Sequence, residues 1–429
     1  MSAADAAAPS PIRTARSAWM LGALALGLAL GIAAGEMDEA LREPALQAAT
    51  MIGNLWLNAL KMTVIPLIVA LLVLGIAQGA EAMRAGRIAA RTMTWFILFY
   101  LASAAFGAAV ISFLLRVAPL PDAGLAAIRS GLASLDPGAV PATVPQMSDF
   151  FAGIIPANAF GAAANGDVLP LVVFTLLFAM AATRIPADSR RTLLAFFEAI
   201  RNTLLVLIGW VLWVGPIGVF ALAFALGSGA GGAVVAALLH YIVLLCLVGL
   251  GIGLAGYAIA IGYVRLPPGK FAKVMVGPQS IAISSRSSLA SVPAMIAAAG
   301  KLGVRERVAD IAFPLIGALF RPTSPAMNVA VVLYVAHLLG LEPSSGQMVA
   351  ALVVASVVAF GTVSLPGEIS FITTIAPIAI ALGVPIAPLA LLVAVEMIPD
   401  TMRTVANVTV DVAVAGAVDR SSGKDVAPA

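Results

Sequence analysis

The stretch Asp400-Thr401-Met402-Arg403-Thr404-Val405-Ala406-Asn407-Val408-Thr409-Val410-Asp411 decides the fold, because it places charges inside a long apolar run. The run extends from Pro388 to Val418, and a helix that crosses a bilayer needs about 20 mostly apolar residues. Its polar and charged side chains recur at spacings of 4, 3, 4 and 4 residues. That spacing puts all of them on one face of a helix: Glu396, Asp400, Arg403, Asn407 and Asp411.

Charges on a membrane-spanning helix indicate function. An ionisable residue near the bilayer centre costs at least about 2.5–3.5 kcal/mol. A stripe of structural salt bridges is the alternative, but pairing alone rarely recovers the cost of removing so many charges from water. Arg403 can hold a carboxylate through two hydrogen bonds, and Asp400 can accept an ammonium group. The face therefore suits an acidic amino acid.

The composition of the whole chain agrees with a membrane location. The chain has 429 residues, of which 61% are hydrophobic and 10% charged. Soluble domains are about 45–50% apolar and about 25% charged, so a secreted disulfide scaffold, a disordered protein and a nucleic-acid binder are excluded. The single cysteine, Cys246, allows no internal disulfide. His240 and His337 lie far apart without partner ligands or an acidic orienter, which argues against a metal site and against a membrane enzyme.

Apolar runs along the chain predict an all-α polytopic membrane protein with eight transmembrane helices. The runs are Ala18–Gly35, Ile52–Gly79, Met93–Leu115, Leu169–Ala182, Leu193–Gly227, Val234–Val264, Ile311–Leu339 and Pro388–Val418. Two further stretches, Phe271–Gly300 and Gln347–Leu382, carry Ser, Gly and Pro at their centres and predict re-entrant helical hairpins. Non-helical backbone at membrane depth survives only inside protein or along a cavity, so these hairpins indicate a substrate path.

Basic residues orient these spans. With alternating spans, every basic cluster falls on one side of the membrane, which is cytoplasmic by the positive-inside rule. The clusters are Arg13 and Arg16; Arg84, Arg87 and Arg91; Arg184, Arg190 and Arg191; Arg265, Lys270 and Lys273; Lys301, Arg305 and Arg307; and Arg420 and Lys424. We therefore expect cytoplasmic tails at residues 1–16 and 419–429 and an outer loop at 119–167. A cleaved signal peptide ending near Ala33-Ala34-Gly35 is the alternative for the first run, but further spans follow it.

Three breaks in the apolar pattern supply candidate ligands. The first hairpin tip, Ser284-Ser285-Arg286-Ser287-Ser288, offers hydroxyls and helix N-terminal N–H groups, although serine also caps helices without binding anything. The second tip, Ser364-Leu365-Pro366-Gly367-Glu368, combines a turn with a carboxylate, and a plain surface turn is the alternative. Prolines within Phe320-Arg321-Pro322-Thr323-Ser324-Pro325 free backbone carbonyls, and unwound carbonyls coordinate cations in transporters.

This order of elements resembles the dicarboxylate/amino acid:cation symporter family, which includes the glutamate transporters. Leu60-Lys61-Met62-Thr63-Val64-Ile65-Pro66-Leu67-Ile68 is similar to its second-span signature. Arg286-Ser287-Ser288 with Val292-Pro293, and Pro366-Gly367, are similar to its hairpin tips. The stretch 400–411 resembles its D-x-x-R-T-x-x-N-x-x-x-D motif.

The resemblance implies the glutamate-transporter-homologue fold, a homotrimer in the inner membrane, and elevator-type alternating access. Residues 17–80 and 169–227 would form the scaffold, and residues 93–117 and 234–418 the transport domain, with hairpins at about 271–300 and 347–382. It implies a small anionic substrate and no nucleic-acid partner. The substrate-binding residues that it implies, with the tip residues, are Ser287, Ser288, Ser324, Gly367, Asp400, Arg403, Thr404 and Asn407. Tyr100, Ser103, Asn407 and Asp411 match positions that help ligate cations.

The departures from the family concern the coupling ion. The family's N-M-D-G-T falls on Phe320-Arg321-Pro322-Thr323-Ser324, so two cation ligands are lost and a guanidinium is gained. We expect Arg321 to repel metal cations and to pair with Glu368 or Glu396. A carboxylate in a low-dielectric site can carry a proton, so Glu368 and Glu396 are candidate proton carriers. The coupling ion is thus H⁺ or Na⁺, with no cofactor and no certain metal site beyond a possible residual sodium site at Asn407 and Asp411.

Three functions remain open from the sequence. The first is a proton-coupled symporter for aspartate or glutamate with little sodium dependence. The second is a C4-dicarboxylate symporter of the same fold, but such a substrate gains nothing from Asp400 at the ammonium position. The third is a substrate sensor that has lost coupled transport, which the altered seventh span permits.

Overall fold

The computed structural model describes residues 11–84, 86–121, 125–126, 129, 155–165, 167–361 and 367–423. These residues form helices and their connections, and none of them lies in a strand. Five helical segments are long and apolar enough to cross a membrane, in agreement with the predicted polytopic membrane protein. They are Glu39–Arg84, Arg87–Val117, Ala187–Trp213, Ala233–Tyr263 and Glu306–Leu339. The full count of eight spans stays a prediction, as does the outer loop, most of which lies outside the described residues.

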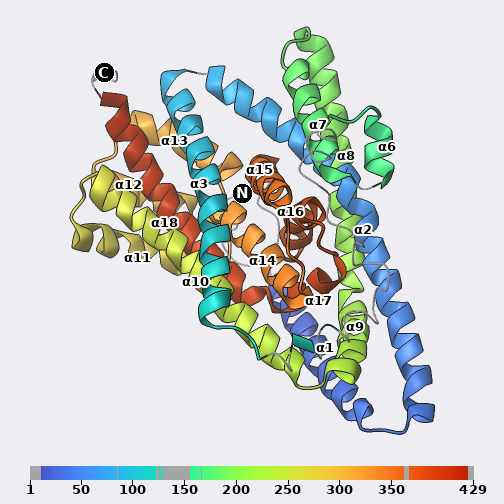
Figure 1. Ribbon diagram of the computed structural model, residues 1–429. Helices are drawn as coiled ribbons and strands as arrows, with labels where there is room; N and C mark the ends of the chain where they lie inside the picture. Colours follow the sequence, from blue (N-terminus) through green and yellow to red (C-terminus); the bar gives the residue numbers. More distant parts are fainter. Residues whose placement is uncertain are drawn as a thin grey trace.

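The molecule has two sides with a group of helices between them (Figure 1). On one side α2 packs against α7, α8 and α9, and α1 packs along α9. The helices of this side are α1 (Pro11–Gly35), α2 (Glu39–Arg84), α6 (Ala159–Asn165), α7 (Val168–Ala182), α8 (Ala187–Trp213) and α9 (Gly215–Ala230). The division into scaffold and transport domains stays a prediction.

On the other side α18 packs against α3, α10, α11 and α12. The helices here are α3 (Arg87–Val117), α10 (Ala233–Ala258) with a π-helical segment at Ile259–Tyr263, α11 (Pro268–Ser285), α12 (Ser288–Leu302), α13 (Glu306–Leu319) and α18 (Met397–Ser422). Between the two sides lie α14 (Thr323–Leu339), α15 (Ser345–Gly361), α16 (Gly367–Leu382) and α17 (Ala387–Val395).

Both predicted hairpins are pairs of helices that pack against each other: α11 with α12, and α15 with α16. The chain reverses between α11 and α12 at Arg286, which adopts a left-handed conformation with φ of 49°. Residues 362–366, at the second predicted tip, lie outside the described residues. Whether either pair re-enters a membrane stays a prediction.

Prolines break three of the predicted spans. The predicted break of the seventh span lies at Phe320–Pro322, between α13 and α14. Two other spans were expected to be continuous, and the structure corrects this. The run Leu193–Gly227 is interrupted at Val214, just before Gly215-Pro216, and the last span is interrupted at Glu396, three residues before Pro399. Proline lacks the N–H that would continue the helical ladder to the preceding turn.

Glycine allows α1 and α9 to approach closely. Gly27, Gly31 and Gly35 recur every four residues, the spacing by which small residues let membrane helices meet. A Cβ atom on Gly31 would collide with the backbone carbonyl of Phe224 in α9, whereas one on Gly22 would meet nothing. Backbone atoms cannot move aside as a flexible side chain can, so this contact requires glycine.

We therefore expect Gly31→Val to lower the thermal unfolding midpoint of the detergent-solubilised protein, because overpacking typically costs about 1–3 kcal/mol. Gly22→Val, on the same helix, is the matched control and should leave the midpoint unchanged. Equal midpoints for the two variants would contradict the close packing of α1 on α9.

Candidate functional site

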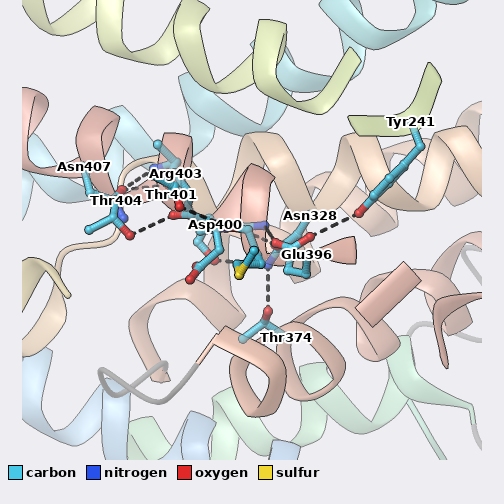
Figure 2. Close-up of polar contacts among 12 residues, drawn as sticks. Tyr241, Asn328, Thr374, Glu396, Asp400, Thr401, Arg403, Thr404 and Asn407 are labelled. Atoms are coloured by element: carbon cyan, nitrogen blue, oxygen red, sulfur yellow. Dashed lines mark hydrogen bonds and ion pairs between the residues drawn. The ribbon is translucent and has the colours of Figure 1, made fainter. Parts of the chain in front are cut away.

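The polar face of the last span is buried in the protein. Glu396 is 3% exposed, Asp400 9%, Asn407 4% and Asp411 1%, and all four face neighbouring helices rather than the outer surface. Glu396 lies at the turn between α17 and α18, and the others follow along α18. The predicted groups are therefore buried, but Glu396 precedes the helix that carries the others; Figure 2 shows Glu396, Asp400, Arg403 and Asn407 with their polar contacts.

Arg403 forms a buried ion pair with Glu396 two turns earlier. Its Nη2 lies 3.0 Å from Glu396 Oε1, and the two side chains are only 14% and 4% exposed. Tyr241 of α10 donates a hydrogen bond of 3.2 Å to Glu396 Oε2 (Figure 2). The expected pairing of Arg321 with Glu396 is wrong, because Arg403 and Tyr241 bind this carboxylate while the Arg321 guanidinium donates to backbone carbonyls.

Asn328 connects Arg403 to two other helices. Its Oδ1 accepts a hydrogen bond of 2.9 Å from Arg403 Nη1. Its Nδ2 donates to Thr374 Oγ1 of α16 at 2.9 Å and to Ser324 Oγ of α14 at 3.1 Å. Arg403 is thus oriented by groups from α14 and α16 together. Thr404 donates to the backbone carbonyl of Asp400 at 2.8 Å, and its place in the pocket stays a prediction.

Two side chains of α3 bind the broken backbone between α13 and α14. The Tyr100 hydroxyl donates to the Leu319 carbonyl at 2.6 Å and accepts from the Arg321 amide at 2.7 Å. Ser103 donates to the Pro322 carbonyl at 2.6 Å. The backbone groups released by the break therefore find partners inside the protein, as groups without access to water must.

The Arg321 side chain turns back onto the end of α13. Its Nη2 donates to the Gly317 carbonyl at 2.8 Å, and its Nη1 to the Phe320 and Ile316 carbonyls at 2.7 and 3.3 Å. Only 6% of the residue is exposed. A cation at a helix C-terminus is stabilised by the carbonyl dipoles that converge there. The other expected partner, Glu368, has a side chain outside the described residues.

Asn407 and Asp411 differ in how their oxygens are satisfied. Asn407 Oδ1 accepts two hydrogen bonds from Thr323, from the amide at 2.9 Å and from the hydroxyl at 2.8 Å. Neither oxygen of Asp411 has a hydrogen-bond partner among the described residues. In that part of the chain, no three His, Cys, Asp or Glu side chains gather as metal ligands would. The possible sodium site at these two residues stays a prediction.

The first hairpin tip behaves as a helix cap in this structure. The Ser287 Oγ accepts from the Ala290 amide at 3.3 Å and begins α12. Ser288 is buried at 8% exposure. The bonds recorded for Ser287 are local to the tip, so its predicted contact with substrate stays a prediction. Of the second tip, Gly367 opens α16, and its surroundings lie outside the described residues.

Sequence reasoning missed four residues of this network: Tyr241, Gln279, Asn328 and Thr374. Gln279 of α11 donates to Thr409 of α18 at 2.9 Å and joins the first hairpin to the polar helix. Asn328 is the only amide side chain in α14 and could have been found, because a polar group inside an apolar span is a functional candidate. A single Tyr or Thr in such a run carries no comparable signal.

The chain is similar to known membrane symporters. A profile of the sodium:dicarboxylate symporter family matches residues 17–421. A proton/sodium-glutamate symport protein of Bacillus subtilis is 27% identical over 82% of this chain and 80% of its own length. A proton/glutamate-aspartate symporter of Escherichia coli is 24% identical, with 75% and 74% covered. A C4-dicarboxylate transport protein of Rhizobium etli is 26% identical, with 86% and 81% covered.

We expect Tyr100→Phe to destabilise the protein, because it leaves the Leu319 carbonyl and the Arg321 amide buried without partners. Each such group costs about 1–3 kcal/mol. Thermal unfolding in detergent measures the change. Tyr257→Phe is the control, since its hydroxyl has no hydrogen bond among the described residues. A Tyr100→Phe midpoint equal to that of the control would show that the hydroxyl does not support the broken backbone.

Proposed function

The chain belongs to the sodium:dicarboxylate symporter family, and from that premise we propose that it is a secondary active symporter for aspartate or glutamate, driven by protons with little or no sodium requirement. The observation that carries the proposal is the buried ion pair between Arg403 and Glu396. The family description names sodium and dicarboxylates. Two of the relatives above are named as glutamate symporters with protons, the Bacillus subtilis protein with sodium as well.

Arg403 is the group that would bind the substrate side-chain carboxylate. Guanidinium and carboxylate groups match in a planar arrangement of two charge-assisted hydrogen bonds. In the structure, Glu396 and Asn328 already hold this guanidinium. A substrate carboxylate must therefore compete with Glu396 for Arg403.

Protonation of Glu396 would resolve this competition. A neutral carboxylic acid holds a guanidinium far less strongly than a carboxylate does, so the proton releases Arg403 to the substrate. The reverse also holds, because substrate bound to Arg403 leaves Glu396 without its cation and favours its neutral form. The ionisable groups around Glu396 are Arg403, Asp400, Tyr241 and Cys246. Proton and substrate would thus bind together and cross together.

The remaining features of the proposal follow the family resemblance. Asp400 would bind the substrate ammonium, and Thr404, Asn407, Ser324 and the two hairpin tips would complete the pocket. The protein would be a homotrimer in the inner membrane with both termini in the cytoplasm. Residues 93–117 and 234–418 would move as an elevator against a scaffold of residues 17–80 and 169–227.

A C4-dicarboxylate symporter is the second candidate, favoured by relatives such as the Rhizobium etli protein. The same Arg403 and Glu396 would serve such a substrate. The difference lies at Asp400, because succinate or fumarate has no ammonium group for it to bind.

The test of the coupling ion uses labelled aspartate and proteoliposomes with a proton gradient and a sodium gradient imposed separately. We expect concentrative uptake from an inward proton gradient without sodium. Glu396→Gln mimics the protonated acid, so it should reduce concentrative uptake at least about tenfold while exchange of internal for external aspartate persists. Glu342→Gln, at an exposed position between α14 and α15, is the matched control and should behave as the unmodified protein.

Three outcomes would decide against parts of this proposal. Strict sodium dependence of the unmodified protein would overturn proton coupling. Aspartate uptake that survives Arg403→Ala would overturn the role of Arg403. Aspartate binding without any uptake would indicate a sensor.

The test of the substrate class is Asp400→Asn, with unlabelled succinate competing against labelled aspartate. We expect the variant to weaken aspartate binding at least about tenfold more than succinate binding, because hydrogen bonds to charged groups contribute about 1.5–3 kcal/mol. Equal losses for both ligands would favour the dicarboxylate symporter.

A further inference from the structure

The break between α13 and α14 gathers negative charge away from water. Carbonyls at a helix C-terminus together carry the equivalent of about half a negative charge. The Asp411 carboxylate is 1% exposed, and none of the described residues gives either of its oxygens a hydrogen bond. If this side chain is ionised, it costs a large free energy there unless a cation lies near it.

Arg321 supplies a cation at this place. In an unbroken helix its backbone amide would donate to the Gly317 carbonyl, but this amide donates instead to Tyr100. The guanidinium returns to bind the same Gly317 carbonyl, together with those of Ile316 and Phe320. It also attracts Asp411 electrostatically, although no direct ion pair joins the two described side chains.

The other oxygens at the break are also taken by donors of the protein. Tyr100 occupies the Leu319 carbonyl, Ser103 the Pro322 carbonyl, and Thr323 the side-chain oxygen of Asn407. Carbonyls freed at a helix break coordinate sodium in secondary transporters. Here the carbonyls of the last turn of α13, at Ile316, Gly317 and Leu319, and those of the break, at Phe320 and Pro322, already accept hydrogen bonds.

We propose that Arg321 is a tethered cation that permanently occupies the position of an exchangeable ion, neutralising the end of α13 and Asp411. The proposal deepens the proposed function, because it gives the reason why sodium would not be required. A covalently attached charge needs no binding from solution and cannot be released on either side. Removal of the guanidinium then turns this oxygen-rich cluster into a site for a small monovalent cation.

The experiment measures thermal unfolding of the purified full-length protein without substrate, in sodium chloride and in choline chloride at equal ionic strength. The unmodified protein should show the same midpoint in both salts. Arg321→Met removes the charge at nearly constant side-chain length. Its midpoint in choline should fall, and sodium should restore it in a concentration-dependent way, because an ion that binds only the folded state stabilises it.

Two controls separate the tethered charge from other effects. Arg321→Lys keeps the cation and should show no sodium response. The double variant Arg321→Met with Asp411→Asn removes the anion as well, so the sodium response should disappear. Because no substrate is present, these results do not depend on whether aspartate or a dicarboxylate is carried.

Either of two results overturns the proposal. One is a folded, monodisperse Arg321→Met protein whose midpoint does not respond to sodium. The other does not require that variant to fold: sodium stabilisation of the unmodified protein that is lost in Asp411→Asn would show an exchangeable ion already at this site.

Discussion

The arrangement of this protein depends on one constraint, which is that its buried charges have no water to solvate them. In the bilayer interior, every backbone group freed from a helix and every ionised side chain must find its partner within the protein. Two arginines meet this requirement in different ways. Arg403 is held by a carboxylate and a side-chain amide, whereas Arg321 is held by backbone carbonyls. The carboxylate that holds Arg403 can lose its charge by protonation. The backbone carbonyls that hold Arg321 cannot be changed in this way.

The helices around α14 form a single network because of these requirements. Asn328 of α14 bonds to Arg403 of α18 and to Thr374 of α16, while Thr323 at the start of α14 bonds to Asn407. A displacement of α16 would therefore break a hydrogen bond that orients Arg403. Because α16 is the second helix of a predicted hairpin, the position of that hairpin affects how the Arg403 side chain is oriented.

The sequence predicted the elements that have a strong local signal. The spacing of charges on the last span, the helix pair at Phe271–Gly300 and the break at Phe320–Pro322 all follow from periodicity and proline, and the structure contains them. Side-chain contacts between residues far apart in the sequence were harder to predict from local patterns. Arg321 was expected to pair with a carboxylate, but its guanidinium donates to backbone carbonyls of its own preceding turn. The turn at Glu396 was missed because the polar residues keep their helical spacing across it, from Glu396 to Asp411.

The two arginines together indicate how charge can balance during a transport cycle. A symporter binds its substrate and its coupling ion in the loaded state and neither in the empty state, so at least one group of the site has to exchange its partner. Arg321 cannot be that group, because its partners are backbone carbonyls that stay with the chain. Asp411 would need no exchange either if Arg321 is its tethered cation, as proposed above. Glu396 is different, since its partner Arg403 is also the group that suits an anionic substrate. In the proposed cycle, one proton taken up at Glu396 and one carboxylate bound at Arg403 would leave the local charge unchanged, so the loaded site would cost no more to move through the bilayer than the empty one.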